Sequence, residues 1–497
     1  MQPVLGAAPP TPRADRRRQR VTFAVLAVSV SSFALLQSLI VPVLATIQAQ
    51  YDTDQATVTW VLTGYLLSAS IATPILGRVG DAVGKKKVLV ATLVLLALGS
   101  LLAALAPTIG WLIAARVVQG LGGGVMPLAF GIIRDEFDDQ VTFALSVIAS
   151  LTAVGFGFGI VVAGPIVDGL GYHWLFWLPM IVTALAAVAA FVLVPESPSR
   201  TPGGVPLLPA APLALTLVAL LLAVSQGNKW GWGSPAVLGL LAAAVVIGTL
   251  WVRVETRVAV PMIDMRMMRL RGVWTTNLVA FFVGFGTFAS FGFLPQLLQT
   301  PPSAGYGFDA TISESGHLLL PSALASFLVG FTTARLIGWV GARRVIATGT
   351  LISAAAFASV ALFHDEKWQL YLATTTQGLG SGLVFSSLAG VVIASVPRAQ
   401  TGVASGMNAN IRTIGGSMGS AVMAGVLTAS LGPGGFPDER GYTIGFALLA
   451  VGMLAATVAA AYLPDDRSSR PARRTRSALA DADNAELGYL PAAPAPQ

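Results

Sequence analysis

The chain has 497 residues, of which 55% are hydrophobic and only 11% charged, and its mean hydropathy is +0.74. Soluble globular domains average about 25% charged residues, so this composition excludes a water-soluble fold and indicates an all-α protein that crosses the lipid bilayer many times. No cysteine is present and the three histidines are far apart in sequence, so we expect no disulfide, no metal site and no cofactor.

A membrane-spanning helix needs about 20 mostly apolar residues. In chain order, the predicted spans are 22–48, 56–77, 88–106, 110–133, 141–166, 174–194, 207–225, 235–253, 273–299, 313–337, 345–362, 368–395, 402–430 and 441–463. The two ends, 1–20 and 464–497, are rich in Pro, Ala, Arg and Asp and are predicted to be disordered tails. Residues 195–206 are predicted to form a loop.

The basic residues support fourteen crossings. With the N-terminus in the cytoplasm, nearly all Lys and Arg residues fall on the cytoplasmic side, as the positive-inside rule requires. Of the 30 basic residues, the exceptions are Lys229, Lys367 and Arg440 on the other side and Arg116 and Arg412 within spans. We therefore predict a multi-pass protein of the plasma (inner) membrane with both tails in the cytoplasm. The net charge of +7 is then an orientation signal and indicates no nucleic-acid partner.

An internal repeat divides the chain. Residues 77–88 (GRVGDAVGKKKV) align with 334–345 (ARLIGWVGARRV), and 116–124 (RVVQGLGGG) align with 374–382 (TTTQGLGSG) at almost the same spacing. Related halves side by side are how many transporters build a binding site at the membrane midplane. The predicted parts are a six-helix half at 21–194, an inserted pair of helices with linkers at 195–272, and a second six-helix half at 273–463.

These segments resemble the major facilitator superfamily, and the resemblance covers essentially the whole chain outside the tails. Residues 77–87 are similar to its cytoplasmic signature and 116–120 (RVVQG) to its fourth-helix element. Gly155, Gly159 and the pair Gly164-Pro165 are similar to its antiporter motif. The resemblance implies the major facilitator fold, with two pseudo-symmetric six-helix bundles around a cavity and the two inserted helices at the periphery. The internal repeat favours a monomer as the working unit.

Later segments resemble one subgroup, the fourteen-helix drug:proton antiporters. They are Pro261-Met262-Ile263-Asp264-Met265 and Gly402-Val403-Ala404-Ser405-Gly406-Met407-Asn408, followed by Arg412 and Gly415-Gly416. None of them indicates a particular substrate.

The resemblance implies a latch that holds the cytoplasmic end shut. Gly77 and Gly84 permit close approach and a tight turn, and Asp81 can accept hydrogen bonds from a helix N-terminus across the interface between the halves. Arg78 belongs to the same segment. Arg412 is predicted to pair with the Asp81 segment, or alternatively to form a structural ion pair elsewhere.

Arg116 is predicted to take part in conformational or proton coupling, because an arginine at a helix centre costs about 2.5–3.5 kcal/mol and usually faces a cavity or a partner. Snorkelling of its side chain toward the outer surface is the alternative. The subgroup commonly has an acidic residue midway along the first helix, where this sequence has Gln37. A buried carboxylate is the usual proton carrier, because burial disfavours its charge. The nearest candidates are Asp168 and, preferred, Glu314; otherwise the coupling differs from that of the subgroup.

The small residues of the antiporter motif recur about one helical turn apart, which allows two helices to pack closely. Tight packing alone explains them, and sealing a leak path is a second interpretation that the sequence cannot separate from the first.

The substrate cavity is predicted to be apolar with a few polar groups, as a lipophilic ligand requires. The candidate lining residues are Gln37, Gln119, Asn277, Phe281, Phe285, Gln296 and Asn408.

The predicted function is export of small lipophilic compounds, cationic ones included, by alternating access driven by the proton gradient. A dedicated exporter of an endogenous lipid or secondary metabolite, not necessarily coupled to protons, is the alternative. A membrane enzyme or a channel is disfavoured, because the sequence offers no nucleophile or metal cluster and its internal repeat suits a carrier.

Overall fold

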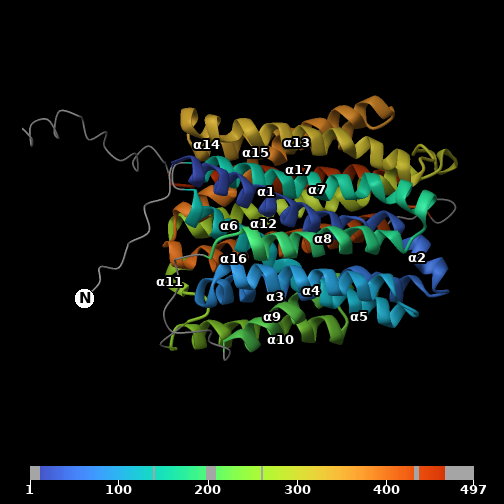
Figure 1. The fold of residues 1–497 in the computed structure, drawn as a ribbon. Helices are drawn as coiled ribbons and strands as arrows, with labels where there is room; N and C mark the ends of the chain where they lie inside the picture. The colour runs from blue at the N-terminus through green and yellow to red at the C-terminus, as the bar shows by residue number, and fades with distance from the viewer. Residues whose placement is uncertain (1–11, 138–139, 197–208, 259–260, 430–435, 465–497) are drawn as a thin grey trace, which may run out of the picture.

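A computed structural model describes residues 12–137, 140–196, 209–258, 261–429 and 436–464, which are almost entirely α-helical (Figure 1). Thirteen helical stretches among them are long and apolar enough to cross a membrane. α16 (Thr401–Ala429) is equally long but less apolar, because it carries Asn408, Asn410 and Arg412 in a glycine-rich sequence. With α16, the described helices are consistent with the fourteen predicted spans.

The first half of the chain forms six spans. They are α1 (Pro12–Ser38), α3 (Gln55–Val83), α4 (Lys85–Ala104), α5 (Ile109–Gly120) continued by α6 (Val125–Glu136), α7 (Val141–Leu170) and α8 (Trp174–Leu193), with the short α2 (Leu44–Gln50) after α1. The inserted region contributes α9 (Ala210–Trp230), α10 (Pro235–Glu255) and the short α11 (Met265–Met268). The second half forms α12 (Arg271–Gln299), α13 (Ile312–Val340), α14 (Ala342–Leu362), α15 (Lys367–Ala394), α16 and α17 (Glu439–Ala460).

The repeated segments occupy matching positions in the two halves. The sequence predicts a loop from about residue 78 to 87, but α3 continues to Val83 and the turn is confined to Gly84, whose φ is 129°. In the second half α13 ends at Val340 and Gly341 makes the turn with φ 88°. Side chains strongly disfavour such φ values, so glycine is required at both turns. The repeat therefore encodes two equivalent helix-to-helix turns, and Asp81 lies on a helix.

The two halves meet most extensively along two pairs of helices, α3 with α16 and α7 with α13, and α6 and α7 also contact α16 and α15, respectively. These pairs are equivalent under the internal repeat, because α13 is the counterpart of α3 and α16 that of α7. Each half has its own apolar core. That of the second half is built mainly from α12 to α17, and that of the first half consists of two clusters mainly from α1 to α8. We call the end of the bundle that holds the Gly84 and Gly341 turns the basic end, because the basic loops gather there.

The inserted helices lie at one edge of the bundle, with α10 outermost (Figure 1). The sequence predicts both at the periphery, but α9 packs against α3 of the first half and α16 of the second. The Asn228 side chain on α9 donates to the Ala421 carbonyl of α16 at 2.7 Å. α9 therefore bridges the two halves.

Large apolar side chains are exposed around the bundle, among them Leu185, Val245 and Trp339. Such a surface is what a lipid-embedded protein presents.

At the N-terminus, α1 begins at Pro12, inside the segment predicted to be disordered. Proline suits the first helical turn, and Arg18 pairs with Glu136 at 3.1 Å, which holds the start of α1 against the end of α6. Residues 1–11 and 465–497, the rest of the predicted tails, lie outside the described residues, as does most of the predicted 195–206 loop.

Candidate functional site between the two halves

At the basic end, one carboxylate joins the two halves. The two oxygens of Asp81 accept hydrogen bonds from the backbone N–H groups of Gly402, at 3.3 Å, and Val403, at 3.1 Å. These N–H groups belong to the first turn of α16, where unpaired donors and the helix dipole favour a negative charge. Asp81 is fully enclosed, so a charge-assisted contact connects α3 to α16.

Glycines bring the two backbones together beside this carboxylate. A Cβ atom added to Gly77 would lie 2.6 Å from the carbonyl oxygen of Gly402, and one added to Gly406 would lie 2.9 Å from the carbonyl oxygen of Thr73. No side chain fits at these positions without displacing backbone. The basic end is therefore closed in this structure.

Arg134, at the end of α6, also crosses the interface and was not singled out from the sequence. It donates to the hydroxyl of Thr401 and to the carbonyl of Val396, both at 2.7 Å. Its signal in the sequence is a basic residue at the predicted cytoplasmic end of a span, which by itself indicates only the orientation of the chain. Nearby, the buried Lys85 ammonium lies 2.8 Å from Asp135 and 3.8 Å from Asp81, so it helps to balance the enclosed carboxylates.

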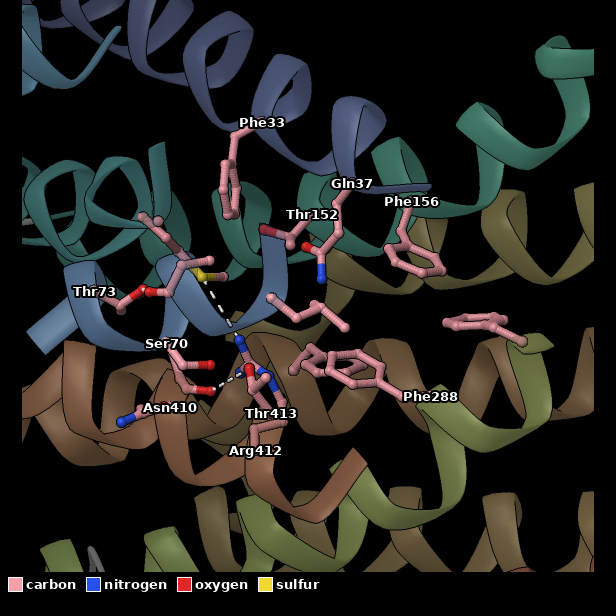
Figure 2. A pocket seen from close by; sticks show the side chains of 17 residues that line it. Phe33, Gln37, Ser70, Thr73, Thr152, Phe156, Phe288, Asn410, Arg412 and Thr413 are labelled. Carbon is pink, nitrogen blue, oxygen red and sulfur yellow. Dashed lines mark hydrogen bonds between the residues drawn. The ribbon is translucent and has the colours of Figure 1, made fainter. Parts of the chain in front are cut away.

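Two neighbouring cavities that share lining residues lie between the halves, farther from the basic end. Their order follows α3: Thr59 to Leu66 line an outer cavity of about 410 Å³, and Leu66 to Thr73 line a smaller central cavity of about 70 Å³ (Figure 2). The aromatic walls come from both halves, and the phenylalanines that line one or both cavities are Phe33, Phe156, Phe288, Phe291, Phe293 and Phe385. Aromatic walls with few polar groups suit a lipophilic ligand.

The residues predicted to line the cavity divide into two groups. Gln37 lines both cavities, and Asn408 lines a small adjoining pocket on the basic side of Arg412. Asn277 is buried and accepts a hydrogen bond from Asn408 at 2.9 Å.

The other predicted residues lie away from the described cavities. The backbones of Phe281 and Phe285 pack against Gly415 and Gly419 of α16, and Gln296 is exposed. The phenylalanines that line the cavity follow one or two turns later on α12. Spacing alone shows which phenylalanines share a helix face, and it leaves open which face points inward.

Arg412 lies in the central cavity, and no bond joins it to the Asp81 segment. Figure 2 shows its guanidinium reaching from α16 toward the space near Gln37 and Ser70. Its Nη2 lies 3.7 Å from the sulfur of Met126, and its Cζ lies 5.1 Å from the ring centroid of Phe385. The predicted partnership between Arg412 and Asp81 is thus wrong: Asp81, on α3, meets the first turn of α16, and Arg412 lies about three turns farther along α16.

Arg116 is fully buried within the first half. Its Nε donates to the carbonyl of Val61 at 3.1 Å, and its Nη1 donates to Gln119 at 2.7 Å. The Gln119 Nε2 atom in turn donates to the hydroxyl of Ser100 at 2.8 Å. Gln119 lines none of the three pockets between the halves. The guanidinium also lies over the ring of Tyr65, 4.3 Å from its centroid, and Tyr65 lines the outer cavity. Arg116 is thus one side chain behind the cavity wall.

The carboxylates considered as proton carriers are exposed. Glu314 forms a capping box with Thr311 at the start of α13, accepting from its backbone N–H at 3.0 Å, and Asp168 lies near the end of α7. Both are at the end opposite to the basic end. The structure therefore brings neither into the cavities between the halves.

The glycines of the antiporter motif serve two contacts of α7. A Cβ atom at Gly155 would lie 2.9 Å from both the Ser31 carbonyl oxygen and the Ala34 side chain of α1. Gly159 faces α1 one turn later, and Gly164 faces Ser313 of α13. These small residues allow α7 to pack closely on α1 and on the other half.

Comparison with known proteins decides the family. The model of the Major Facilitator Superfamily matches residues 26–420 and 276–494, most of the chain. The chain belongs to the Major Facilitator Superfamily. It is therefore a transport protein rather than an enzyme, as its sequence predicts.

Among the relatives of this superfamily member, some are named for the transport or export of drugs. It is 28% identical, over 75% of its length and 69% of the relative, to "Multidrug transporter protein MdtP" of Bacillus subtilis. It is 25% identical to the "Tetracenomycin C resistance and export protein" of Streptomyces glaucescens, over 85% of its length and 78% of the relative. The crystal structure of the human organic anion transporter MFSD10 superposes with a TM-score of 0.61 at 17% identity, covering 91% of this chain and all of that one; this likeness concerns the fold.

Proposed function

We propose that this protein exports small lipophilic molecules from the cytoplasm by alternating access, in exchange for protons. It would work as a monomer in the plasma (inner) membrane, with its basic end and both termini in the cytoplasm. One observation carries the proposal: an aromatic cavity lies between two repeated halves, and the halves are sealed at one end by Asp81 on the first turn of α16. Closure at one end of a midplane cavity is one of the two states that a carrier needs.

Coupling to protons would run through the seal. Glu314 and Asp168 are exposed at the far end, whereas Asp81 is enclosed and bonds directly across the interface. A protonated carboxyl group has no charge to offer the helix N-terminus and one oxygen fewer to accept with. Protonation would therefore weaken the closed basic end and favour the state open to the cytoplasm.

Arg116 would connect this switch to the cavity. It lies behind Tyr65 on the cavity wall, and its Nε bond to Val61 fastens α5 to α3, the helix that carries Asp81. A substrate that moved Tyr65 would thus move a group bonded to α3. An exchange of protons for substrate needs such a connection between the two sites.

A dedicated exporter is the second candidate. The relative from Streptomyces glaucescens is named for resistance to, and export of, a single compound. The same aromatic cavity suits either breadth of substrate, so the number of compounds carried separates the two functions.

The test is proton movement in vesicles that contain the purified protein and an internal pH indicator. A panel of chemically unrelated lipophilic dyes and drugs is added to the outside. We expect saturable proton movement with several compounds, loss of it in Asp81→Asn, and normal behaviour in the matched control Asp365→Asn, an exposed residue at the opposite end.

Each outcome has a meaning. Proton movement with only one compound of the panel would favour the dedicated exporter. Saturable substrate transport without proton movement would contradict antiport, and silence from folded protein across the whole panel would contradict export.

A further inference from the structure

The charge that lines the cavity between the halves is positive. Arg412 is the only charged side chain among the described residues that line the central cavity, the small pocket beside it or the outer cavity. No aspartate or glutamate is in any of the three linings. A cationic substrate would therefore meet a like charge and find no carboxylate to balance its own.

The fold holds Arg412 in this position. A Cβ atom on Gly284 of α12 would clash with the Arg412 carbonyl, so the two backbones are in close contact there. With its backbone against α12, Arg412 directs its side chain the other way, across to Met126 of the first half. The contacts with the Met126 sulfur and the Phe385 ring orient the guanidinium, and neither supplies a negative charge.

Two further polar groups at the central cavity are unsatisfied. The hydroxyl of Ser70 and both amide atoms of Asn410 have no hydrogen-bond partner among the described residues, although the two residues are only 3% and 2% exposed. Buried polar groups normally have partners, and leaving one unpaired costs free energy. A ligand with acceptor oxygens would pair with the two donors among them, the Ser70 hydroxyl and the Asn410 NH₂ group, and with Arg412.

A second cation acts on the same space. Arg116 lies behind Tyr65, which lines the outer cavity, and its Nη2 has no partner among the described residues. None of the ion pairs among these residues includes Arg116 or Arg412. Two uncompensated guanidinium groups in low-dielectric surroundings give the cavity a positive potential.

We propose that the preferred substrates are amphipathic organic anions, such as aromatic carboxylates, whose anionic group binds Arg412 while the ring packs against Phe288 and Phe291. Guanidinium binds a carboxylate through two parallel hydrogen bonds, and the contact strengthens where water is excluded. This proposal rests on the proposed export function and replaces the expectation that cationic compounds are carried.

The experiment compares three compounds with one aromatic body and different charge: 2-naphthoate, 2-naphthamide and 2-naphthylmethylammonium. Affinity and uptake are measured with the full-length protein, in detergent and in vesicles. We expect tight, saturable binding of naphthoate, weaker binding of the amide and the weakest binding of the ammonium compound.

The decisive variants alter the guanidinium. Arg412→Gln is expected to lower naphthoate affinity by about 10- to 100-fold, the usual effect of one charged hydrogen-bonded contact, and to change amide affinity little. Arg412→Lys keeps the charge but not the paired geometry, so part of the naphthoate affinity should return. Arg344→Gln, at an exposed position on α14, is the matched control and should behave like the wild type.

The failures are distinguishable. Equal binding of all three compounds, or equal loss of anion and amide in Arg412→Gln, would overturn the anion proposal and leave export standing. Preferred binding of the ammonium compound would overturn it as well. If no compound of the series or of the wider drug panel is transported by folded protein, the proposed function fails and the anion proposal fails with it.

Discussion

At the basic end, the enclosed carboxylate of Asp81 joins the two halves of the molecule. Asp81 caps α16 from the other half of the molecule, and it lies beside Lys85 in a site closed to water. Because its hydrogen bonds cross the interface, any change in its charge alters the contact between the halves rather than the stability of one helix. In the proposed mechanism, opening of the basic end therefore begins with a change in the charge of Asp81.

Asp81→Asn should loosen this end. Asparagine has no charge, and its NH₂ group would face backbone N–H donors, so we expect a loss of about 1.5–3 kcal/mol of closure. The chain has no cysteine, so a single Ser405→Cys reports on access to this interface. Its maleimide labelling should rise about tenfold or more in Asp81→Asn, because labelling follows the open population. Unchanged labelling would mean that Asp81 does not hold the end shut.

Glu314→Gln should leave proton-coupled transport intact. The exposed Glu314 caps α13 in a box that glutamine also completes, so the expected loss of stability is below about 1 kcal/mol. Proton movement in vesicles, with and without a substrate, is the measurement. Abolished coupling in folded Glu314→Gln protein would return this carboxylate to the pathway and count against Asp81.

The sequence predicts part of this chemistry. The contact of Asp81 is predictable, because a carboxylate between two glycines that permit close approach indicates a hydrogen-bond donor on a neighbouring helix. The position of Arg412 does not follow, because its surroundings are set by α6 and α15, distant in sequence. A single sequence gives no measure of which helices meet across the interface.

At the scale of the helices, glycine sets how closely neighbouring spans approach. α7 lies between α1 and α13, and its glycines face both, while Gly284, Gly415 and Gly419 do the same between α12 and α16. Lipid gives helices no hydrophobic reason to associate, so this close packing has to hold them.

Gly155→Val tests the packing of α7 on α1. The added side chain would press on the Ser31 carbonyl and Ala34, and such overpacking costs about 1–3 kcal/mol. Gly239→Val on α10 is the matched control, because a Cβ atom there meets open space. The midpoint of thermal unfolding in detergent should fall for Gly155→Val and stay near the wild-type value for Gly239→Val. Equal midpoints would show that the glycine is not needed for packing.

Hydropathy identifies the helices well, because every span needs a long apolar run, and it places their ends less well. α3 runs to Val83 through Arg78 and Asp81, which resemble loop residues by composition. Both are buried there, and Asp81 accepts hydrogen bonds from the first turn of α16. α16 shows the converse: Asn408, which bonds to Asn277 of α12, and Arg412, which faces Met126 of the other half, lower the hydropathy of a helix that is largely buried.

At the scale of the whole molecule, the two halves form two bodies joined by equivalent helix pairs. The basic end is closed by Asp81, Arg134 and the glycine contacts, and the cavities lie beyond it. α9 bridges both halves and lines the outer cavity with Val224, Ser225 and Asn228. One helix of the inserted pair, α9, therefore lines the proposed transport path, although composition alone indicates only two more spans.

The most direct test of this account is the distance between spin labels at both ends of the molecule. One pair, Val83→Cys with Ala394→Cys, spans the basic end, and the other, Gly110→Cys with Asp365→Cys, spans the opposite end; all four positions are exposed. On acidification the account predicts that the basic-end distance lengthens while the other shortens, and that an added substrate shifts the two populations. If both distances stay fixed in protein that still transports, alternating access about the Asp81 seal is contradicted.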